Sequence, residues 1–318
     1  MSITERIDST TRIPASHRAT ICPAPKSVKI EITARCNLRC TFCSLKNREA
    51  QALEDMDFTL FQNITEQMRA AGVEEIGVFF IGESFMSPHL LTDCIRWCKK
   101  TLKFPYVFLT SNASLATPIH VEDCFRAGLD SLKWSCNAAD EEQYKELMCV
   151  SPKYFRKARE NIQEAWQIRQ RGGYQCGLYA SSIRYDGEQQ AKMEQYLDAH
   201  VIPYVDEHYW LPLYGEMTRA TQERIDELGF APTAGNQGRL GNLRDPLPCW
   251  TVLTEGHVTS EGMLSACCFD ADGKFDMGDL KRVPFMEAWN SLKFQELRGA
   301  HLAKDVSGTP CAQCVAYA

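Results

Sequence analysis

Three cysteines lie close together near the start of the chain. Cys36, Cys40 and Cys43 fall within "EITARCNLRCTFCSLKN", residues 31–47, directly after a run of alternating apolar and polar residues. A structural zinc site needs a fourth ligand nearby, and no His or Cys follows within 40 residues of Cys43. A thioredoxin-like CxxC pair would usually open a helix in a shorter βαβ fold. Three thiolates on one short loop indicate instead an iron–sulfur cluster with one iron that the protein does not ligate.

A second set of cysteines lies near the other end of the chain. It consists of Cys249, the adjacent pair Cys267 and Cys268, and the pair Cys311 and Cys314. A distant CxxC with a β-hairpin before it can hold either zinc or a second cluster, and the residues alone leave both open. Isolated cysteines are predicted to be small buried apolar residues: Cys22, Cys94, Cys98, Cys124, Cys149 and Cys176.

Composition excludes several classes of protein. The 318 residues are 44% hydrophobic and 24% charged, as in ordinary globular proteins. The formal net charge is −6 and no concentrated Lys/Arg block exists, which argues against a nucleic-acid partner. No apolar run is long enough to span a membrane, and the first 20 residues lack the apolar centre of a signal peptide. We therefore expect a cytoplasmic protein without a membrane or nucleic-acid partner.

The elements that position the cysteines follow a β–α alternation. Six strands are predicted, each followed by a helical stretch, and they occupy residues 27–33, 75–82, 106–112, 131–137, 175–183 and 201–210. Such an alternation predicts an α/β fold with a parallel sheet closing into a partial barrel. Active sites on such a sheet lie at the carboxyl ends of the strands, and the first three cysteines are at such an end.

The chain is predicted to divide into three parts. Residues 1–26 form an N-terminal extension that packs loosely on the rest of the protein, and residues 27–225 form the barrel. A Gly-, Pro- and Asn-rich stretch then leads into a small α+β domain, residues 226–318, with a hairpin over 252–268 and a helix near 284–301.

"CNLRCTFC" resembles the cluster motif of the radical S-adenosylmethionine (SAM) superfamily, including the aromatic Phe42 before the third cysteine. The resemblance implies a partial (β/α)6 barrel, similar to a TIM barrel, and a [4Fe–4S] cluster whose open iron binds SAM. It also implies that SAM is cleaved reductively to a 5′-deoxyadenosyl radical, which abstracts hydrogen from a substrate. A reductase such as flavodoxin or ferredoxin would then be a partner.

The same resemblance assigns residues at the ends of the predicted strands. Gly82, Glu83 and Ser84 correspond to the family's "GGEP" motif with departures at the first glycine and the proline, and Glu83 would bind the SAM amino group. Further cofactor-binding candidates at later strand ends are Ser111, Asn112, Ser135, Asn137 and Arg184. Each also has a plain structural role open to it, as a turn, a strand-end hydrogen bond or a surface charge.

The C-terminal segments resemble the SPASM/twitch extension of radical SAM enzymes. This implies one auxiliary [4Fe–4S] cluster with four ligands, Cys249, Cys267, Cys311 and Cys314, and a role in electron transfer. Cys267 and Cys268 would point in opposite directions on an extended hairpin. Cys268 would then be a spare thiol, able to return a hydrogen atom to a carbon radical if it faces the substrate.

Three reactions fit this resemblance. The first is oxidation of a small hydroxylated substrate, such as a sugar, an aminocyclitol or a related natural product, with the auxiliary cluster as electron acceptor. His208, within "YVDEHYWLPLYGEM" (204–217), is the candidate proton acceptor. Epimerisation with a cysteine hydrogen donor and modification of a ribosomal peptide are the alternatives. A non-enzymatic electron carrier would have no use for an open iron.

Overall fold

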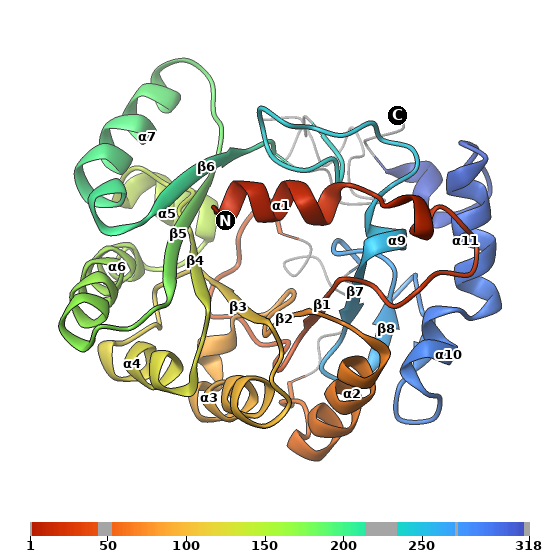
Figure 1. Ribbon diagram of the computed structural model, residues 1–318. Helices are drawn as coiled ribbons and strands as arrows, with labels where there is room; N and C mark the ends of the chain where they lie inside the picture. The colour runs from red at the N-terminus through yellow and green to blue at the C-terminus, as the bar shows by residue number, and fades with distance from the viewer. Residues whose placement is uncertain (1, 44–52, 214–233, 271–272, 315–318) are drawn as a thin grey trace.

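A single curved sheet organises the molecule (Figure 1). The computed structural model describes residues 2–43, 53–213, 234–270 and 273–314. Within them the strand order is β6-β5-β4-β3-β2-β1-β7-β8-β9. The strands are β1 (Ser27–Ile30), β2 (Glu75–Gly77), β3 (Tyr106–Ser111), β4 (Ser131–Ser135), β5 (Gly177–Ile183), β6 (Glu207–Leu211), β7 (Glu255–Val258), β8 (Met263–Ser265) and β9 (Gly278–Asp279). Strands β1 to β6 pair in parallel, which confirms the predicted partial barrel.

Helices cover the outer face of this sheet (Figure 1). Around the barrel they are α2 (Phe58–Ala71), α3 (Pro88–Arg96), α4 (Pro118–Ala127), α5 (Glu141–Met148), α6 (Lys153–Gly172) and α7 (Gly187–His200). The C-terminal region adds α9 (Thr251–Thr254), α10 (Phe285–Trp289) and α11 (Leu292–Leu302). No helix in the described ranges combines the length and the apolar character that crossing a membrane requires.

Alternation along the strands separates the core from the barrel interior. Val28 and Ile30 of β1 are fully buried in the apolar core, whereas Lys29 between them points into the barrel. Helix α2 ends at Gly72, whose φ of +98° is the left-handed conformation that glycine adopts at little cost. The chain can therefore turn back at once into β2.

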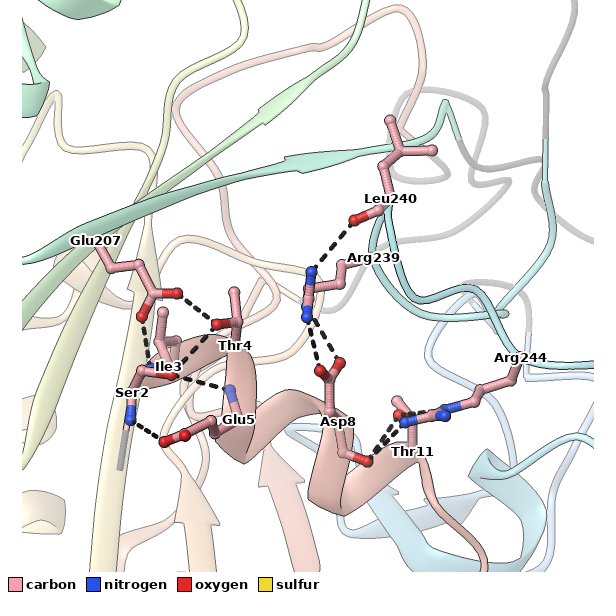
Figure 2. A network of polar contacts seen from close by, with 10 residues as sticks. All are labelled: Ser2, Ile3, Thr4, Glu5, Asp8, Thr11, Glu207, Arg239, Leu240 and Arg244. Carbon is pink, nitrogen blue, oxygen red and sulfur yellow. Dashed lines mark hydrogen bonds and ion pairs between the residues drawn. The ribbon is translucent and has the colours of Figure 1, made fainter.

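The N-terminal segment differs from expectation. Loose packing is predicted for residues 1–26, but α1 (Ile3–Thr11) lies across the amino ends of the strands. Figure 2 shows why it is fixed: Asp8 forms an ion pair with Arg239 at 2.6 Å, and the Ile3 amide donates to Glu207 of β6 at 2.9 Å. Arg244 donates to the Asp8 carbonyl oxygen at 3.0 Å. Helix α1 thus closes the barrel at the end opposite the cysteine loop.

The C-terminal strands continue the sheet of the barrel. The predicted hairpin is confirmed as the antiparallel pair β7 and β8, but β7 also pairs in parallel with β1, with Lys29 opposite His257. The small α+β region therefore shares a sheet with the barrel. The predicted boundary at 225/226 lies outside the described residues, and the three-part division stays a prediction.

Several predicted elements differ in extent; the strand expected over 27–33, for example, ends at Ile30. The strand expected over 75–82 ends at Gly77, and the one expected over 201–210 begins with a 3₁₀ turn, Ile202–Tyr204, that contains Pro203. Proline lacks the amide hydrogen that strand pairing requires. The helix expected near 284–301 is divided into α10 and α11 because Ser291 caps a new helix by accepting from the Phe294 amide.

Candidate functional site

The three-cysteine loop lies directly beyond β1, at the carboxyl ends of the barrel strands. Backbone hydrogen bonds hold it against α5: the Arg39 amide donates to the Met148 carbonyl at 3.0 Å and the Thr41 amide to Leu147 at 2.8 Å. The Cys40 Sγ atom lies 3.2 Å from Met148 Sδ. The loop is thus anchored, and its thiols are half-buried.

The chemistry of these thiols fits an iron–sulfur cluster. Burial, together with the neighbouring Glu83 carboxylate, raises the pKa of Cys36 to about 12, and burial raises the pKa of Cys40 well above its usual value. Such clustered thiols lose their protons readily only when positive metal ions compensate the charge. In the described ranges, no three His, Cys, Asp or Glu side chains converge on one metal position. A cubane cluster does not need that convergence, because each thiolate binds a different iron.

Gly82 brings the next predicted segment against this loop. A Cβ atom on Gly82 would lie 2.1 Å from the Thr33 carbonyl oxygen, so no other residue fits without moving backbone. The Glu83 amide donates to the Arg35 carbonyl at 2.9 Å, one residue before Cys36. The Gly-Glu segment is therefore joined to the cysteine loop through backbone contacts.

The structure brings Glu83, Ser111 and Asn112 together at the strand ends. The Glu83 carboxylate accepts from the Ser111 hydroxyl at 2.9 Å and from the Asn112 amide at 2.8 Å. Burial raises the pKa of Glu83. Ser84, in contrast, is buried and donates to the Val78 carbonyl at 2.7 Å, which is a structural contact. The roles of these residues toward SAM stay predictions.

The remaining candidates are placed less uniformly. Phe42 packs in a small apolar cluster with Leu38 beside the cysteine loop. Ser135 ends β4, and Asn137 accepts from the Ile183 amide at 3.0 Å, which joins the ends of β4 and β5. Arg184 is exposed. Asn137 thus has a structural contact of its own, and Arg184 lies at the surface.

The second cysteine set also gathers in space. Cys249 precedes α9, Cys267 and Cys268 follow β8, and Cys311 and Cys314 lie on a short 3₁₀ turn, Pro310–Gln313, and at its end. Burial raises the pKa of Cys249 to about 11 and that of Cys311 to about 12, and each is raised further by charge on Cys314. A hydrogen bond with Cys268 raises the pKa of Cys267 well above its usual value. These thiols suit a metal cluster on the same grounds as the first set.

The adjacent pair differs from expectation in one respect. Strand β8 ends at Ser265, so Cys267 and Cys268 lie in a turn rather than on an extended strand. Strict alternation of side chains therefore does not decide which of them ligates. Cys267 and Cys268 interact with each other, and both interact with Cys249.

A cavity of about 230 Å³ fills the barrel interior between α1 and the strands. Lys29 and Glu255, on the adjacent strands β1 and β7, form an ion pair on its wall at 2.8 Å. Although burial opposes ionisation, Lys29 lowers the pKa of Glu255 to about 2, and Glu255 outweighs burial to raise the pKa of Lys29. Lys133 and Cys268 also line the cavity. These charged side chains therefore lie within a wall that is otherwise mostly apolar, with Phe79, Phe108 and Leu109 among its residues.

Two histidines lie on opposite faces of the sheet. His208, the candidate proton acceptor, alternates with the cavity-lining Tyr209, so the structure does not bring it to the cavity. Its Nε2 atom lies 3.0 Å from the Ser182 hydroxyl, and burial lowers its pKa to about 4. His257 of β7 is on the interior face, with Nε2 3.0 Å from Glu255 Oε2. Tyr214 and Glu216 of the same predicted segment lie outside the described residues.

Four residues on the inner face of the barrel were not predicted from the sequence: Lys29, Lys133, Glu255 and His257. A signal for them existed: each is a charged or polar residue at an alternate position of an otherwise apolar strand, as in "SVKI" and "SLKWS". A half-buried sheet with water on one face gives the same pattern. Only closure of the barrel shows that these side chains meet inside it.

Comparison with known proteins supports the cofactor assignment. The family model described as the radical SAM superfamily matches residues 30–179, and the SPASM model, described as an iron–sulfur cluster-binding domain, matches residues 249–315. A GTP 3′,8-cyclase of Chlorobaculum tepidum is 28% identical over 120 residues, which are 38% of this chain and 35% of that protein. The chain thus spans about a third of the length of this curated relative.

Solved structures share the fold at low identity. Streptococcus suis SuiB bound to precursor peptide SuiA superposes with a TM-score of 0.64 at 17% identity, over 93% of this chain and 71% of that chain. Native anSMEcpe with bound AdoMet gives 0.62 at 13% identity, over 86% and 83%. BtrN in complex with AdoMet and 2-DOIA gives 0.54 at 14% identity, over 87% and 86%.

The two family matches imply which cofactors the protein binds. A radical SAM domain implies a SAM-binding [4Fe–4S] cluster, and a SPASM domain implies auxiliary iron–sulfur ligation. The cysteines of both sets fall within the matched ranges, Cys314 one residue before the end of the second. The chain is a radical SAM protein with a C-terminal SPASM domain.

Proposed function

We propose that this protein is a radical SAM dehydrogenase that oxidises a small hydroxylated substrate bound in the barrel cavity. The observation that carries the proposal is the position of the cavity. Its wall contains Trp250 and Cys268, which are the chain neighbours of the predicted auxiliary ligands Cys249 and Cys267. A substrate bound there would lie next to the auxiliary cluster, which is where an electron acceptor is needed.

The size of the cavity favours a small molecule, and the few charged groups on its largely apolar wall would orient the hydroxyl groups of such a molecule. A volume of about 230 Å³ lies below the range of drug-sized pockets. The Lys29–Glu255 pair, Lys133 and the Tyr209 hydroxyl offer donors and acceptors suited to substrate hydroxyl groups. A peptide, the substrate of the alternative maturase function, would need more room than a cavity of about 230 Å³ offers, so the cavity supports this alternative less.

The bound cofactors would supply the 5′-deoxyadenosyl radical for hydrogen abstraction and, at the auxiliary site, an acceptor for the second electron. The chain itself must accept the proton that an alcohol loses on oxidation. We assign this role to the buried Glu255–His257 pair in place of His208: Glu255 lines the cavity, and His257, which does not line it, is bonded to Glu255 from behind. Glu255 is ionised and can only accept, so His257 Nε2 carries the proton and Nδ1 keeps its lone pair. That Nδ1 atom is buried and has no partner among the described residues.

Mass spectrometry after anaerobic reconstitution tests the proposal. Reduced protein should cleave SAM to 5′-deoxyadenosine, with a flavodoxin or ferredoxin as the physiological reductant, and a hydroxylated substrate should lose two mass units. His257→Gln should slow oxidation by about 10²-fold or more while SAM cleavage persists, whereas His208→Gln should leave the rate near that of the wild type. Absence of SAM cleavage by protein with both clusters loaded would exclude the proposal and leave a simple electron carrier.

One observation favours epimerisation as a second candidate. Cys268 lines the cavity, so its thiol is placed to return a hydrogen atom to a substrate radical. In deuterated water an epimerase would incorporate one solvent deuterium at carbon with no other change in mass. Cys268→Ala would abolish that incorporation, whereas a dehydrogenase would still form the oxidised product.

A further inference from the structure

His301 connects two predicted ligands of the auxiliary cluster that lie far apart in the sequence. It is fully buried, in the last turn of α11. Its Nδ1 atom accepts from the Cys249 backbone amide at 3.2 Å, and its Nε2 atom lies 3.3 Å from Cys311 Sγ. Nothing in the domain match or in the cysteine pattern assigns a role to this histidine.

These two contacts fix which ring nitrogen carries the proton. A backbone amide can only donate, so Nδ1 must be the unprotonated acceptor. The proton of the ring therefore resides on Nε2, which faces the sulfur of Cys311. The contact with Cys311 is accordingly an N–H···S hydrogen bond in which sulfur accepts.

The ring is held in this orientation by the packing of α11. Arg298, one turn before His301, is also fully buried. Its Nε atom donates to the Val252 carbonyl at 2.8 Å, and its Nη1 atom donates to the Thr20 carbonyl at 3.0 Å. The contact with Val252 ties α11 to α9, directly after Cys249. The distance between His301 and the Cys249 segment is thereby maintained.

We propose that His301 is a positioning residue that donates a hydrogen bond to the ligating sulfur of Cys311 and makes the auxiliary cluster easier to reduce. A donor to a ligating sulfur stabilises negative charge, and a reduced cluster carries one more negative charge than an oxidised one. The hydrogen bond therefore raises the reduction potential. This inference rests on the predicted ligand set and is independent of whether the protein oxidises or epimerises its substrate.

A redox titration of the auxiliary cluster alone tests this inference. Cys36→Ala, Cys40→Ala and Cys43→Ala together remove the SAM-binding cluster, so that the electron paramagnetic resonance signal of the other remains. In that background His301→Leu should make one-electron reduction about tenfold less favourable, a shift of about 59 mV to lower potential. His301→Gln keeps a side-chain donor and should restore most of the shift. His200→Leu, at the end of α7, should change nothing, and an unchanged potential in His301→Leu with a loaded cluster would overturn the proposal.

A second measurement needs no loss-of-donor variant and decides the matter if His301→Leu fails to assemble its cluster. The same triple-alanine protein, labelled with ¹⁵N-histidine, is reduced and studied by pulsed electron paramagnetic resonance. A weak ¹⁵N coupling that is altered in His301→Gln supports the hydrogen bond. A strong coupling typical of a nitrogen bound to iron, or no coupling at all, contradicts it.

Discussion

Among single residues, the cysteines of the three-cysteine loop allow the most specific prediction. Three thiolates hold this cluster, so a variant that lacks one of them keeps only two of the protein ligands that the cluster needs. We expect Cys36→Ala protein to contain about four irons per chain instead of about eight, and to show no spectral change with SAM.

The matched control for this variant is Cys149→Ser. Cys149 is exposed, in contrast to the burial predicted from the sequence; it follows α5, close enough to influence Cys40, but it lies outside the motif. It should retain the full iron content. Iron and sulfide analysis after anaerobic reconstitution makes the comparison, and a Cys36→Ala protein that still responds to SAM would refute the assignment.

The adjacent pair Cys267 and Cys268 can be separated in the same way. If Cys267 ligates the auxiliary cluster, Cys267→Ala should lose that cluster and Cys268→Ala should keep it. The physical reason to expect a difference is that Cys268 lines the cavity and influences Lys29, which places it on the cavity side of the pair. Iron content and the spectrum of the reduced auxiliary cluster measure both variants. Retention in Cys267→Ala with loss in Cys268→Ala would reverse the two roles.

At the scale of elements, α1 acts as a closure of the cavity. Its Asp8–Arg239 ion pair is about four-fifths buried, and Asp8→Ala leaves Arg239 without its carboxylate. We expect this to cost about 1 kcal/mol, to lower Tm by about 3 °C and to raise KM for the substrate as the floor of the cavity loosens.

Asp276→Ala provides the comparison, because Asp276 pairs with Lys293 at 3.9 Å on an exposed surface. Surface pairs of this kind contribute almost nothing, so Tm should not change. Thermal unfolding of the two variants side by side isolates the effect of burial. Equal Tm values would mean that α1 does not close the cavity as argued.

Most strands and both cysteine motifs could be predicted from the sequence, whereas the residues inside the barrel could not, and the reason is physical. Strands such as β3 and β4 follow from local alternation, and the cysteine motifs are local too, so residues 31–47 are sufficient to find the first site. Helix α1 is held by Glu207 and Arg239, more than 200 residues away. Its place could not follow from a polar N-terminal stretch. The parallel pairing of β7 with β1 is non-local in the same way.

Non-local pairing also explains why the sequence pointed to His208 as the proton acceptor and not to His257. Both histidines lie in strands, and the period of two gives each one a face without saying which face is the interior. Polar and aromatic residues surround His208 in the sequence, and these favoured it as the candidate. The inward direction of His257 depends on β7 joining the barrel sheet, which is a property of the folded chain.

At the scale of the whole molecule, the two matched domains form one structural unit in the described residues. Strand β1 ends at Ile30, the first residue of the radical SAM match, and β7 lies within the SPASM match. The Lys29–Glu255 ion pair crosses this junction. Since the core residues Val28, Val258 and Leu264 belong to one cluster, unfolding of either part exposes the other.

The ion pair offers a direct test of this cooperation. The folded pKa of Glu255, about 2, lies below its ordinary value of 4.5. The stabilisation is therefore fully present above about pH 4.5 and is lost only as pH falls toward 2, so measurements at neutral pH see all of it. Glu255→Gln leaves the Lys29 ammonium without its partner and should cost about 3 kcal/mol. Lys29→Met combined with Glu255→Gln should cost less than the sum of the single changes.

The denaturation midpoints of the two cluster regions should then move together. Bleaching of the SAM-binding cluster and bleaching of the auxiliary cluster, each isolated in a variant that lacks the other, report on the loop after β1 and on the C-terminal region. With a shared sheet and a shared ion pair, Glu255→Gln should shift both midpoints by the same amount at neutral pH. If only the auxiliary signal shifts, the junction between β1 and β7 does not couple the two domains, and the cavity between them is not a rigid site.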